Sequence, residues 1–453
     1  MSVSEIVAER AERYLDWYIE ACSIPSLADE PDSLADMVAW LDERFHALGA
    51  STERLSIEGA PDAILATLGS GGSGERSVLV YDHYDVQPVD PIELWESKPF
   101  SPEVRNGVLY ARGAADNKGD LVARLAALEV YAGAHGDPPF QIKFLVEGEE
   151  ETGSRSFPVL VARYGHKLAA DGCIWEGAGL DLAGRPELVF GAKGLAYVEL
   201  NHRGLASDQH SSVAVIAPSP VWYLVEALIS LRSPDGRVLI EGFYDDVVPP
   251  SEADEKMLEV LPFEEEAEKR RLGVESFVGG ATGLDLIRRY FFEPTCNIAG
   301  IDAGFTVPGA SKTVLPRSAL AKVDFRLVPD QDPADIVVKL RRHLAKHGFE
   351  KIEILGHSME HPVRSPSDSV IGRAAISAAE KVYADKPAIA PLMIATGPMH
   401  PIAGTLGIPT VSPAGVCRPD SNIHAPNEHC LIEDFNRTIE YTVAWLEAFG
   451  SSG

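Results

Sequence analysis

The stretch VLVYDHYDVQP, residues 78–88, begins as a buried β-strand and ends in polar side chains. Its first four residues form an apolar run of the kind found in the core strands of α/β sheets. His83 and Asp85 follow almost immediately. Because the loops beyond the carboxyl ends of the strands form the ligand crevice of an open α/β sheet, this stretch is predicted to deliver an imidazole and a carboxylate to such a crevice.

Three other acidic groups also follow expected strands: Asp116 in YARGAADNKGD; Glu147 and Glu149 to Glu151 in LVEGEEETGS; and Glu176 in GCIWEGAG. Each of these groups, and the His83–Asp85 pair as well, has an ordinary interpretation when taken alone. The pair can be a chance HxD, the glutamates a solvated run, Asp116 a turn before a helix, and Glu176 a charge at a strand end. Carboxylates gathered in one crevice repel one another unless a cation neutralises them. Their joint placement therefore predicts a site for two metal ions, and imidazole with carboxylates suits Zn²⁺, Mn²⁺ or Co²⁺.

The rest of the chain predicts one α/β domain with a second domain inserted into it. Further core strands are expected at 142–146 and 173–175, and helices at 119–133, 368–384 and 432–449. From about residue 197 to 358, strands of which some alternate polar and apolar residues, together with helices expected at 219–231 and 332–348, indicate a small α+β domain. One exposed helix is expected over 251–271. The expected division is 1–196 and 359–453 for the catalytic α/β domain, and 197–358 for the insertion.

Composition excludes several classes of protein. The 453 residues carry a formal net charge of −28, which argues against a nucleic-acid partner. The chain has no apolar run long enough for a membrane span, and its amphipathic N-terminal segment lacks the pattern of a signal peptide. The five scattered cysteines favour reduced thiols. These features predict a cytoplasmic protein.

Several long motifs resemble the M20 family of dinuclear metallopeptidases. They are YDHYDVQP, LWESKPFSPEVRNGVLYARGAADNKG, EGEEETGS, HSSV, KTVLPR, DFRLVP and NIHAPNEH, and they run in order along almost the whole chain. The resemblance implies a catalytic domain with two metal ions and an inserted lid domain that mediates homodimer formation.

The resemblance also implies a role for each residue that matches a motif. His83 and Glu176 would bind one metal ion, Glu151 and His424 the other, and Asp116 would bridge both. Asp85 would orient the His83 imidazole, and Glu150 would be the general base. In the inserted domain, His210 would stabilise the oxyanion in the partner subunit's site, Arg326 would bind a substrate carboxylate, and Asn297 would bind the substrate carbonyl.

One stretch departs from the family pattern. Many relatives carry a Gly-Gly-Ser or Gly-Gly-Thr turn where this chain reads ATGPMHPIAG. Pro398 lacks a backbone N–H, and Met399 adds adaptable apolar bulk, so recognition of a free carboxylate is open to change here. His400 is either a polar contact or an ordinary loop residue.

The leading functional hypothesis is a dinuclear metallohydrolase that cleaves the amide bond of dipeptides or related short peptides. A second hypothesis is deacylation of N-acyl amino acids or other small amides, which differs in the side of the amide that the pocket recognises. A third is a binding protein on the same fold without catalysis. The presence of Glu150 argues against the third, because a binding module has no need of a base.

Overall fold

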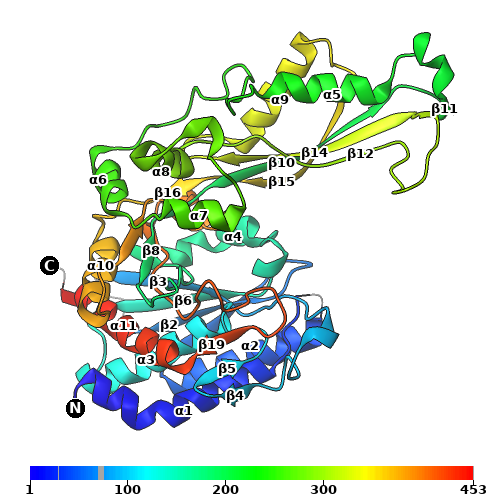
Figure 1. Ribbon diagram of the computed structural model, residues 1–453. Helices are drawn as coiled ribbons and strands as arrows, with labels where there is room; N and C mark the ends of the chain where they lie inside the picture. Colours follow the sequence, from blue (N-terminus) through cyan, green and yellow to red (C-terminus); the bar gives the residue numbers. More distant parts are fainter. Residues whose placement is uncertain (29, 70–75, 452–453) are drawn as a thin grey trace. The chain divides into compact units, whose positions relative to one another are not determined.

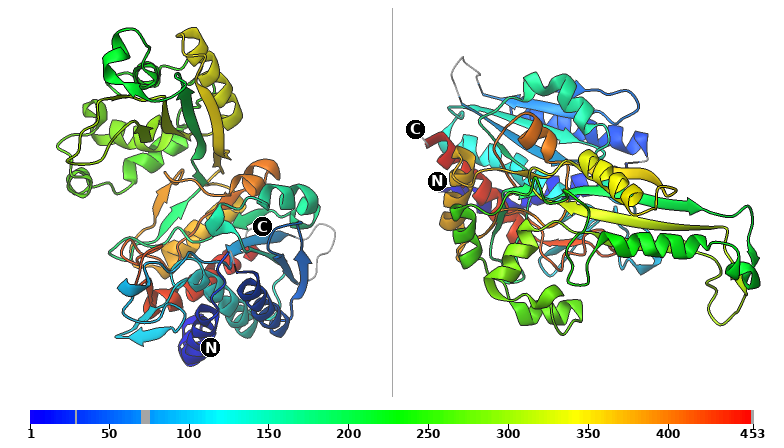
Figure 2. Two further views of the ribbon diagram at one scale, coloured as in Figure 1. Left: turned by 90° about the vertical axis from the view of Figure 1, so that its right-hand side faces the viewer. Right: turned by 90° about the horizontal axis from the view of Figure 1, so that it is seen from above.

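The computed structural model describes residues 1–28, 30–69 and 76–451, and it forms two compact units (Figures 1 and 2). The first unit consists of Met1–Gly191, Arg364–Pro391 and Pro398–Gly453. The second consists of Ala192–Val363 and Leu392–Gly397. Within the described ranges, no helix combines the length and the apolar character that crossing a bilayer requires.

A mixed six-stranded sheet organises the first unit, in the order β1-β2-β6-β3-β7-β18. The strands are β1 (Ser51–Leu55), β2 (Ala63–Leu68), β3 (Ser77–His83), β6 (Gln141–Glu147), β7 (Gly172–Ile174) and β18 (Thr410–Val411). β6, β3, β7 and β18 run parallel, whereas β1 and β2 pair in antiparallel fashion. The expected α/β class with a mixed sheet is therefore confirmed, and four carboxyl strand ends share one edge.

Helices cover this sheet because its central strands are apolar on both faces. The helices of the unit are α1 (Val3–Ser23), α2 (Pro31–Ala47), α3 (Lys118–His135), α4 (Phe157–Leu168), α10 (Val370–Val382) and α11 (Ile432–Ser451). α1, α3 and α11 pack against one another and lie below the sheet in Figure 1, whereas α4 lies above it. A smaller sheet in the order β19-β5-β4 joins β4 (Glu103–Arg105), β5 (Val108–Tyr110) and β19 (His429–Leu431).

The end of β3 shows how the apolar strand holds its polar terminus in place. In the parallel register of β3 and β6, His83 lies opposite Glu147. The Tyr81 ring stacks on Trp175 with centroids 3.6 Å apart, and its hydroxyl donates a 2.5 Å hydrogen bond to Glu147. Tyr81, Trp175 and Glu147 are all buried, and their contacts hold the neighbouring strand ends together beneath the crevice.

The second unit is an antiparallel sheet in the order β12-β14-β10-β15. Its strands are β10 (Gly194–Arg203), β12 (Asn297–Ala303), β14 (Ser318–Leu327) and β15 (Glu353–Glu360), and α5 (Pro220–Leu231) and α9 (Pro333–Lys346) pack on one face. Alternate residues of β10 are buried, as expected for a sheet covered on one side only. Its shorter strands are β11 (Gln209–His210) and β13 (Val314–Leu315). In the first unit β8 (Glu187–Val189) pairs with β17 (Ala388–Ala390), and β9 (Gly191–Ala192) and β16 (Val363–Arg364) lie where the chain passes from one unit to the other.

The single exposed helix expected over 251–271 is wrong. The segment forms two helices, α6 (Glu252–Val260) and α7 (Glu265–Leu272), followed by α8 (Gly283–Phe292). Pro262 separates the first two, because proline cannot donate a helical hydrogen bond and disfavours helical geometry in the residue before it. α6 is also partly buried: Leu258 is buried and α6 contacts α8.

Candidate metal centre

Five side chains from distant parts of the sequence converge at the carboxyl edge of the first unit's sheet. His83 ends β3, and Glu176 follows β7 by two residues. Asp116 lies just before α3, and Glu151 lies in a 3₁₀ turn, Glu150–Thr152, after β6. His424 comes from the long loop between β18 and β19. The parallel strands thus deliver three of the five, as crevice geometry predicts.

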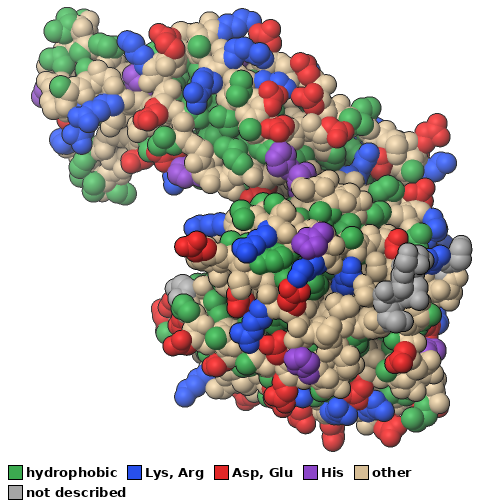
Figure 3. Space-filling view, turned by 180° about the vertical axis from the view of Figure 1, so that it is seen from behind, with side chains coloured by type: hydrophobic (Ala, Val, Ile, Leu, Met, Phe, Trp, Pro, Cys, Tyr) green, Lys and Arg blue, Asp and Glu red, His purple; other side chains and the backbone are tan. Residues whose placement is uncertain are grey.

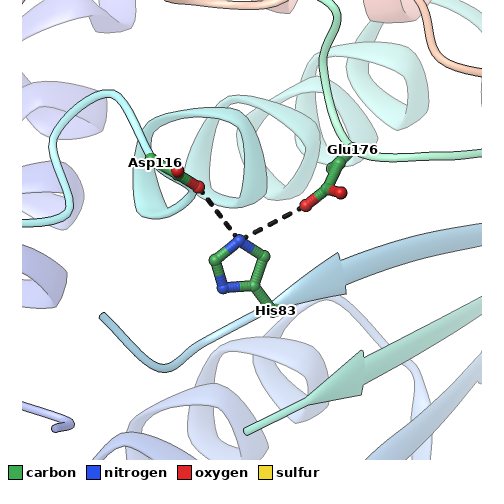
Figure 4. Close-up of side chains that lie close together, drawn as sticks. All are labelled: His83, Asp116 and Glu176. Atoms are coloured by element: carbon green, nitrogen blue, oxygen red, sulfur yellow. Dashed lines mark hydrogen bonds and ion pairs between the residues drawn. The ribbon is translucent and has the colours of Figure 1, made fainter. Parts of the chain in front are cut away.

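His83, Asp116 and Glu176 form the first of two groups (Figure 4). His83 Nε2 points between the two carboxylates, 3.1 Å from Asp116 Oδ1 and 3.3 Å from Glu176 Oε2. The ligand atoms of the group lie within 4.8 Å of one another. This spacing leaves room for one cation bound by one nitrogen and two oxygens.

Asp116 also belongs to the second group, with Glu151 and His424. His424 Nε2 lies 3.2 Å from Asp116 Oδ2 and 3.0 Å from Glu151 Oε2. Asp116 therefore turns one carboxylate oxygen toward each group. A carboxylate in this position could bridge two ions, and three protein ligands per ion would leave coordination positions for water or substrate.

Asp85 supports both the imidazole and the glutamate turn. His83 Nδ1 lies 3.1 Å from the backbone oxygen of Asp85 and 3.4 Å from its carboxylate Oδ1. The same carboxylate accepts the backbone N–H groups of Glu150, at 3.2 Å, and Glu151, at 3.1 Å. Donation from Nδ1 leaves Nε2 facing the two carboxylates, which is the tautomer that a metal ligand requires.

The electrostatics of the cluster favour cations within it. Burial by itself would lower the pKa of His83, but its contacts with Asp116, Asp85 and Glu176 raise that pKa well above its usual value. Contacts with Asp116 and Glu151 raise the pKa of His424 to about 10. Both shifts have the same cause, which is that the surrounding carboxylates favour positive charge at these positions. The donor set of imidazole nitrogens and carboxylate oxygens fits divalent ions in the same positions.

Glu150 lies beside the cluster and outside both groups. Burial, followed by the charge of Glu176, raises the pKa of Glu150 to about 9. The described residues include no hydrogen-bond partner for its carboxylate, whereas Glu151 is engaged by His424 and Gln87. Two adjacent glutamates thus have different environments, and Glu150 is the one available to exchange a proton.

Several supporting residues have no role in the sequence-based interpretation. Gln87 Nε2 donates to Glu151 Oε2 at 3.0 Å, and Trp175 Nε1 donates to Glu176 Oε1 at 2.9 Å. The buried Arg124 guanidinium donates to Asp82 Oδ1 at 2.7 Å and to the Trp175 backbone oxygen at 2.7 Å. Gln87 and Trp175 lie within the quoted stretches VLVYDHYDVQP and GCIWEGAG, and this position is the one sequence signal that points to them. Arg124 lies within an ordinary helical pattern that carries no such signal.

The three candidate residues of the inserted domain lie in the second unit. His210 is exposed on β11, with Nδ1 2.9 Å from Ser212 Oγ and Nε2 3.2 Å from Thr313 Oγ1. Asn297 is exposed on β12 and donates to Asp324 at 2.8 Å. Arg326 on β14 is half-buried and donates to the Thr396 hydroxyl. Each of them makes these contacts within its own unit.

The stretch that departs from the family pattern is packed inside the protein at its two unusual residues. Met399 is 0% exposed and Pro398 is also buried. The Met399 side chain is therefore not at the surface, and an altered recognition of a free carboxylate at this stretch stays a prediction. Thr396, three residues earlier, is the residue of this stretch that contacts Arg326.

An α/β unit with paired histidine–carboxylate groups at the carboxyl edge of its strands has the arrangement expected of a metal-dependent hydrolase. The sequence pattern of peptidase family M20/M25/M40 matches residues 79–448, more than half of the chain. The chain belongs to this family, so the resemblance to M20 enzymes is confirmed. It is a hydrolase that acts on peptide amide bonds.

Three similar proteins illustrate the relationship. A Beta-Ala-His dipeptidase from Mus musculus is 30% identical over 354 residues, which cover 74% of this chain and 71% of that protein. The Cys-Gly metallodipeptidase dug1 from Schizosaccharomyces pombe is 27% identical, with coverages of 76% and 75%. The crystal structure of the M20 family metallo-carboxypeptidase Sso-CP2 from Sulfolobus solfataricus is 38% identical, with a TM-score of 0.88 and coverages of 96% and 99%.

Proposed function

We propose that the protein is a dinuclear metallohydrolase that cleaves the amide bond of dipeptides or related short peptides. The observation that carries the proposal is the placement of the two Asp116 carboxylate oxygens, one toward the His83–Glu176 group and one toward the Glu151–His424 group. The similarity to two dipeptidases supports the substrate class.

Two divalent ions would be held by the five candidate ligands, His83, Asp116, Glu151, Glu176 and His424. We expect Zn²⁺, with Mn²⁺ and Co²⁺ as alternatives that prefer similar ligands. When bound, such a pair of ions polarises the amide carbonyl and makes a nucleophile available from water at neutral pH. Two cations bound beside Glu150 would lower its pKa, so that its carboxylate could accept the proton of that water and pass it to the leaving nitrogen. Asp85 would hold the turn that places Glu150, through the backbone N–H of that residue.

Residues of the second unit would complete substrate recognition. Arg326 has no carboxylate partner among the described residues, and its guanidinium suits bidentate binding of a free substrate carboxylate. Asn297 would bind the substrate carbonyl. His210 would stabilise the oxyanion in the active site of a partner subunit. The insertion would therefore be a lid and dimerisation domain, as the division at residues 197 and 358 anticipates.

A substrate panel tests the proposal against its enzymatic alternatives. Zn²⁺-, Mn²⁺- and Co²⁺-loaded protein is assayed with dipeptides, with N-acetyl and N-succinyl amino acids, and with longer peptides that have a free C-terminus. We expect the highest kcat/KM on dipeptides. Dipeptide activity below one-hundredth of deacylation would replace the proposal with a deacylase. A preference for longer peptides would favour the carboxypeptidase activity named for Sso-CP2.

We also propose a homodimer formed through the second unit. β12 is an edge strand of the sheet, and Ile298 and Ile301 on it are 45% and 54% exposed. On α5, Trp222 and Ile229 are 66% and 68% exposed, and they lie seven residues apart on one helical face. An unpaired strand edge beside exposed apolar side chains is a surface that a second copy of the chain can cover.

The double variant Trp222→Glu/Ile229→Glu is expected to be monomeric. Loss of two large apolar contacts and the burial of charge should raise the dimer dissociation constant by about 100-fold or more. Light scattering after size exclusion measures the mass over a concentration series. Val159→Glu on α4, where the valine is 55% exposed in the first unit, is the control and should remain dimeric. A wild-type monomer, or a dimeric double variant, would contradict this interface.

The cytoplasm is the proposed location. All five cysteines are free, and three of them are buried. A protein with several unpaired thiols suits a reducing compartment. Acidic and basic side chains are intermixed on the face shown in Figure 3.

A further inference from the structure

Glu428 is a buried carboxylate that no part of the proposed chemistry uses. It is 0% exposed, and four N–H groups converge on it. Oε2 accepts from the Arg112 guanidinium at 2.6 Å and from the Gly113 backbone at 2.9 Å. Oε1 accepts from the backbones of Ala115, at 2.8 Å, and Asp116, at 3.0 Å. Both oxygens are thus saturated by one loop.

That loop is the one that carries the bridging carboxylate. The backbone N–H groups of Gly113, Ala115 and Asp116 all donate to the Glu428 carboxylate. The carboxylate therefore fixes the backbone path of this loop as far as Asp116, the candidate bridging ligand. A carboxylate that accepts several hydrogen bonds, some of them charge-assisted, holds such a loop more firmly than neutral partners would. The loop is therefore held around one buried carboxylate.

Glu428 also belongs to the segment that carries His424. It lies four residues after His424 and directly before β19, which pairs with β5. Its backbone oxygen accepts the N–H of Ala111 at 3.1 Å. The side chain and the backbone of one residue therefore join the two segments that supply Asp116 and His424, whose contact spans 308 positions in the sequence.

We propose that Glu428 is a positioning residue that holds Asp116 in register with His424 and so sets the affinity of the site for the ion bound by Asp116, Glu151 and His424. The inference rests on the proposed two-metal function. The other ion keeps His83 and Glu176, whose positions are set by β3 and β7 and by the Arg124 bonds to Asp82 and Trp175. Weakening Glu428 should therefore affect the two ions unequally.

Glu428→Gln is the most informative substitution, because glutamine has nearly the same shape but cannot accept hydrogen bonds from all four N–H donors around it. Each carboxylate oxygen accepts two N–H donors. In either orientation of the amide, its NH₂ group faces two N–H donors, and those two donors have no acceptor. Aspartate keeps the charge but is one methylene shorter, so Glu428→Asp should have an intermediate effect.

The test measures metal content and affinity as well as turnover. At a free Zn²⁺ concentration just sufficient to fill both sites of the wild type, the wild type should hold two ions per chain and Glu428→Gln about one. The affinity for the ion bound by Asp116, Glu151 and His424 should be lowered about 10- to 100-fold. Raising free Zn²⁺ by the same factor should restore the turnover of the variant. Leu446→Ala, a core substitution in α11, should lower Tm while keeping both ions.

The outcomes separate this inference from the proposed function. If Glu428→Gln keeps two ions at wild-type affinity, the positioning role is overturned while the two-metal function stands. A wild type that fails to bind two ions removes the proposed function itself. Loss of the second ion in Leu446→Ala as well would reduce the effect to general destabilisation and overturn the inference. If Glu428→Gln does not fold, Glu428→Asp provides the same comparison.

Discussion

Glu150→Gln is expected to lower kcat about 10³-fold, within the range typical of general acid–base catalysis, while both metal ions remain bound. Glutamine preserves the size of the side chain and removes the ability to accept a proton. The backbone N–H of residue 150, which donates to Asp85, is unchanged by the substitution. Because Glu150 lies outside both ligand groups, metal content should not change.

Glu149→Gln is the matched control for this prediction. Glu149 precedes Glu150 directly, but its carboxylate accepts from the backbone and hydroxyl of Ser156. Its loss should leave kcat within a few-fold of the wild type. Steady-state kinetics on a cleaved dipeptide, with metal analysis of each variant, gives both readouts. Equal turnover of Glu150→Gln and wild type would remove the proposed base.

Asp116→Asn is expected to lose tight binding of both ions and to lower turnover by at least about 10³-fold. Asparagine keeps one carbonyl oxygen and replaces the other by an NH₂ group, which cannot bind a cation. One of the two groups therefore loses a ligand outright. The other loses the negative charge that Asp116 contributes beside His83 or His424.

Thermal unfolding adds a readout that does not depend on turnover. Ions that bind the native state raise its stability, so chelation should lower the Tm of the wild type. The Tm of Asp116→Asn should barely respond to the chelator. Asp181→Asn, in a turn where the carboxylate accepts from Ala183 and Arg185, should behave as wild type. An Asp116→Asn protein with two tightly bound ions would contradict the bridging role.

Local sequence patterns determined much of the fold. The apolar run before His83 is buried on both faces of β3, because only the centre of a parallel sheet accommodates such a run. Strand and helix periodicities likewise predicted β6, β7, α3, α10 and α11 to within a few residues. Pro262 was also visible in the sequence as a helix breaker, and the prediction of one continuous helix did not take it into account.

The sequence also provided the five candidate ligands, because the motifs that contain them resemble those of a known family. Only the tertiary structure decided which oxygen of Asp116 faces which histidine, that Met399 is buried, and that Glu428 holds the Asp116 loop. The physical reason is that these contacts join segments hundreds of residues apart. Local propensity and periodicity describe neighbours along the chain, whereas a buried carboxylate acquires its role from the N–H groups that folding brings to it.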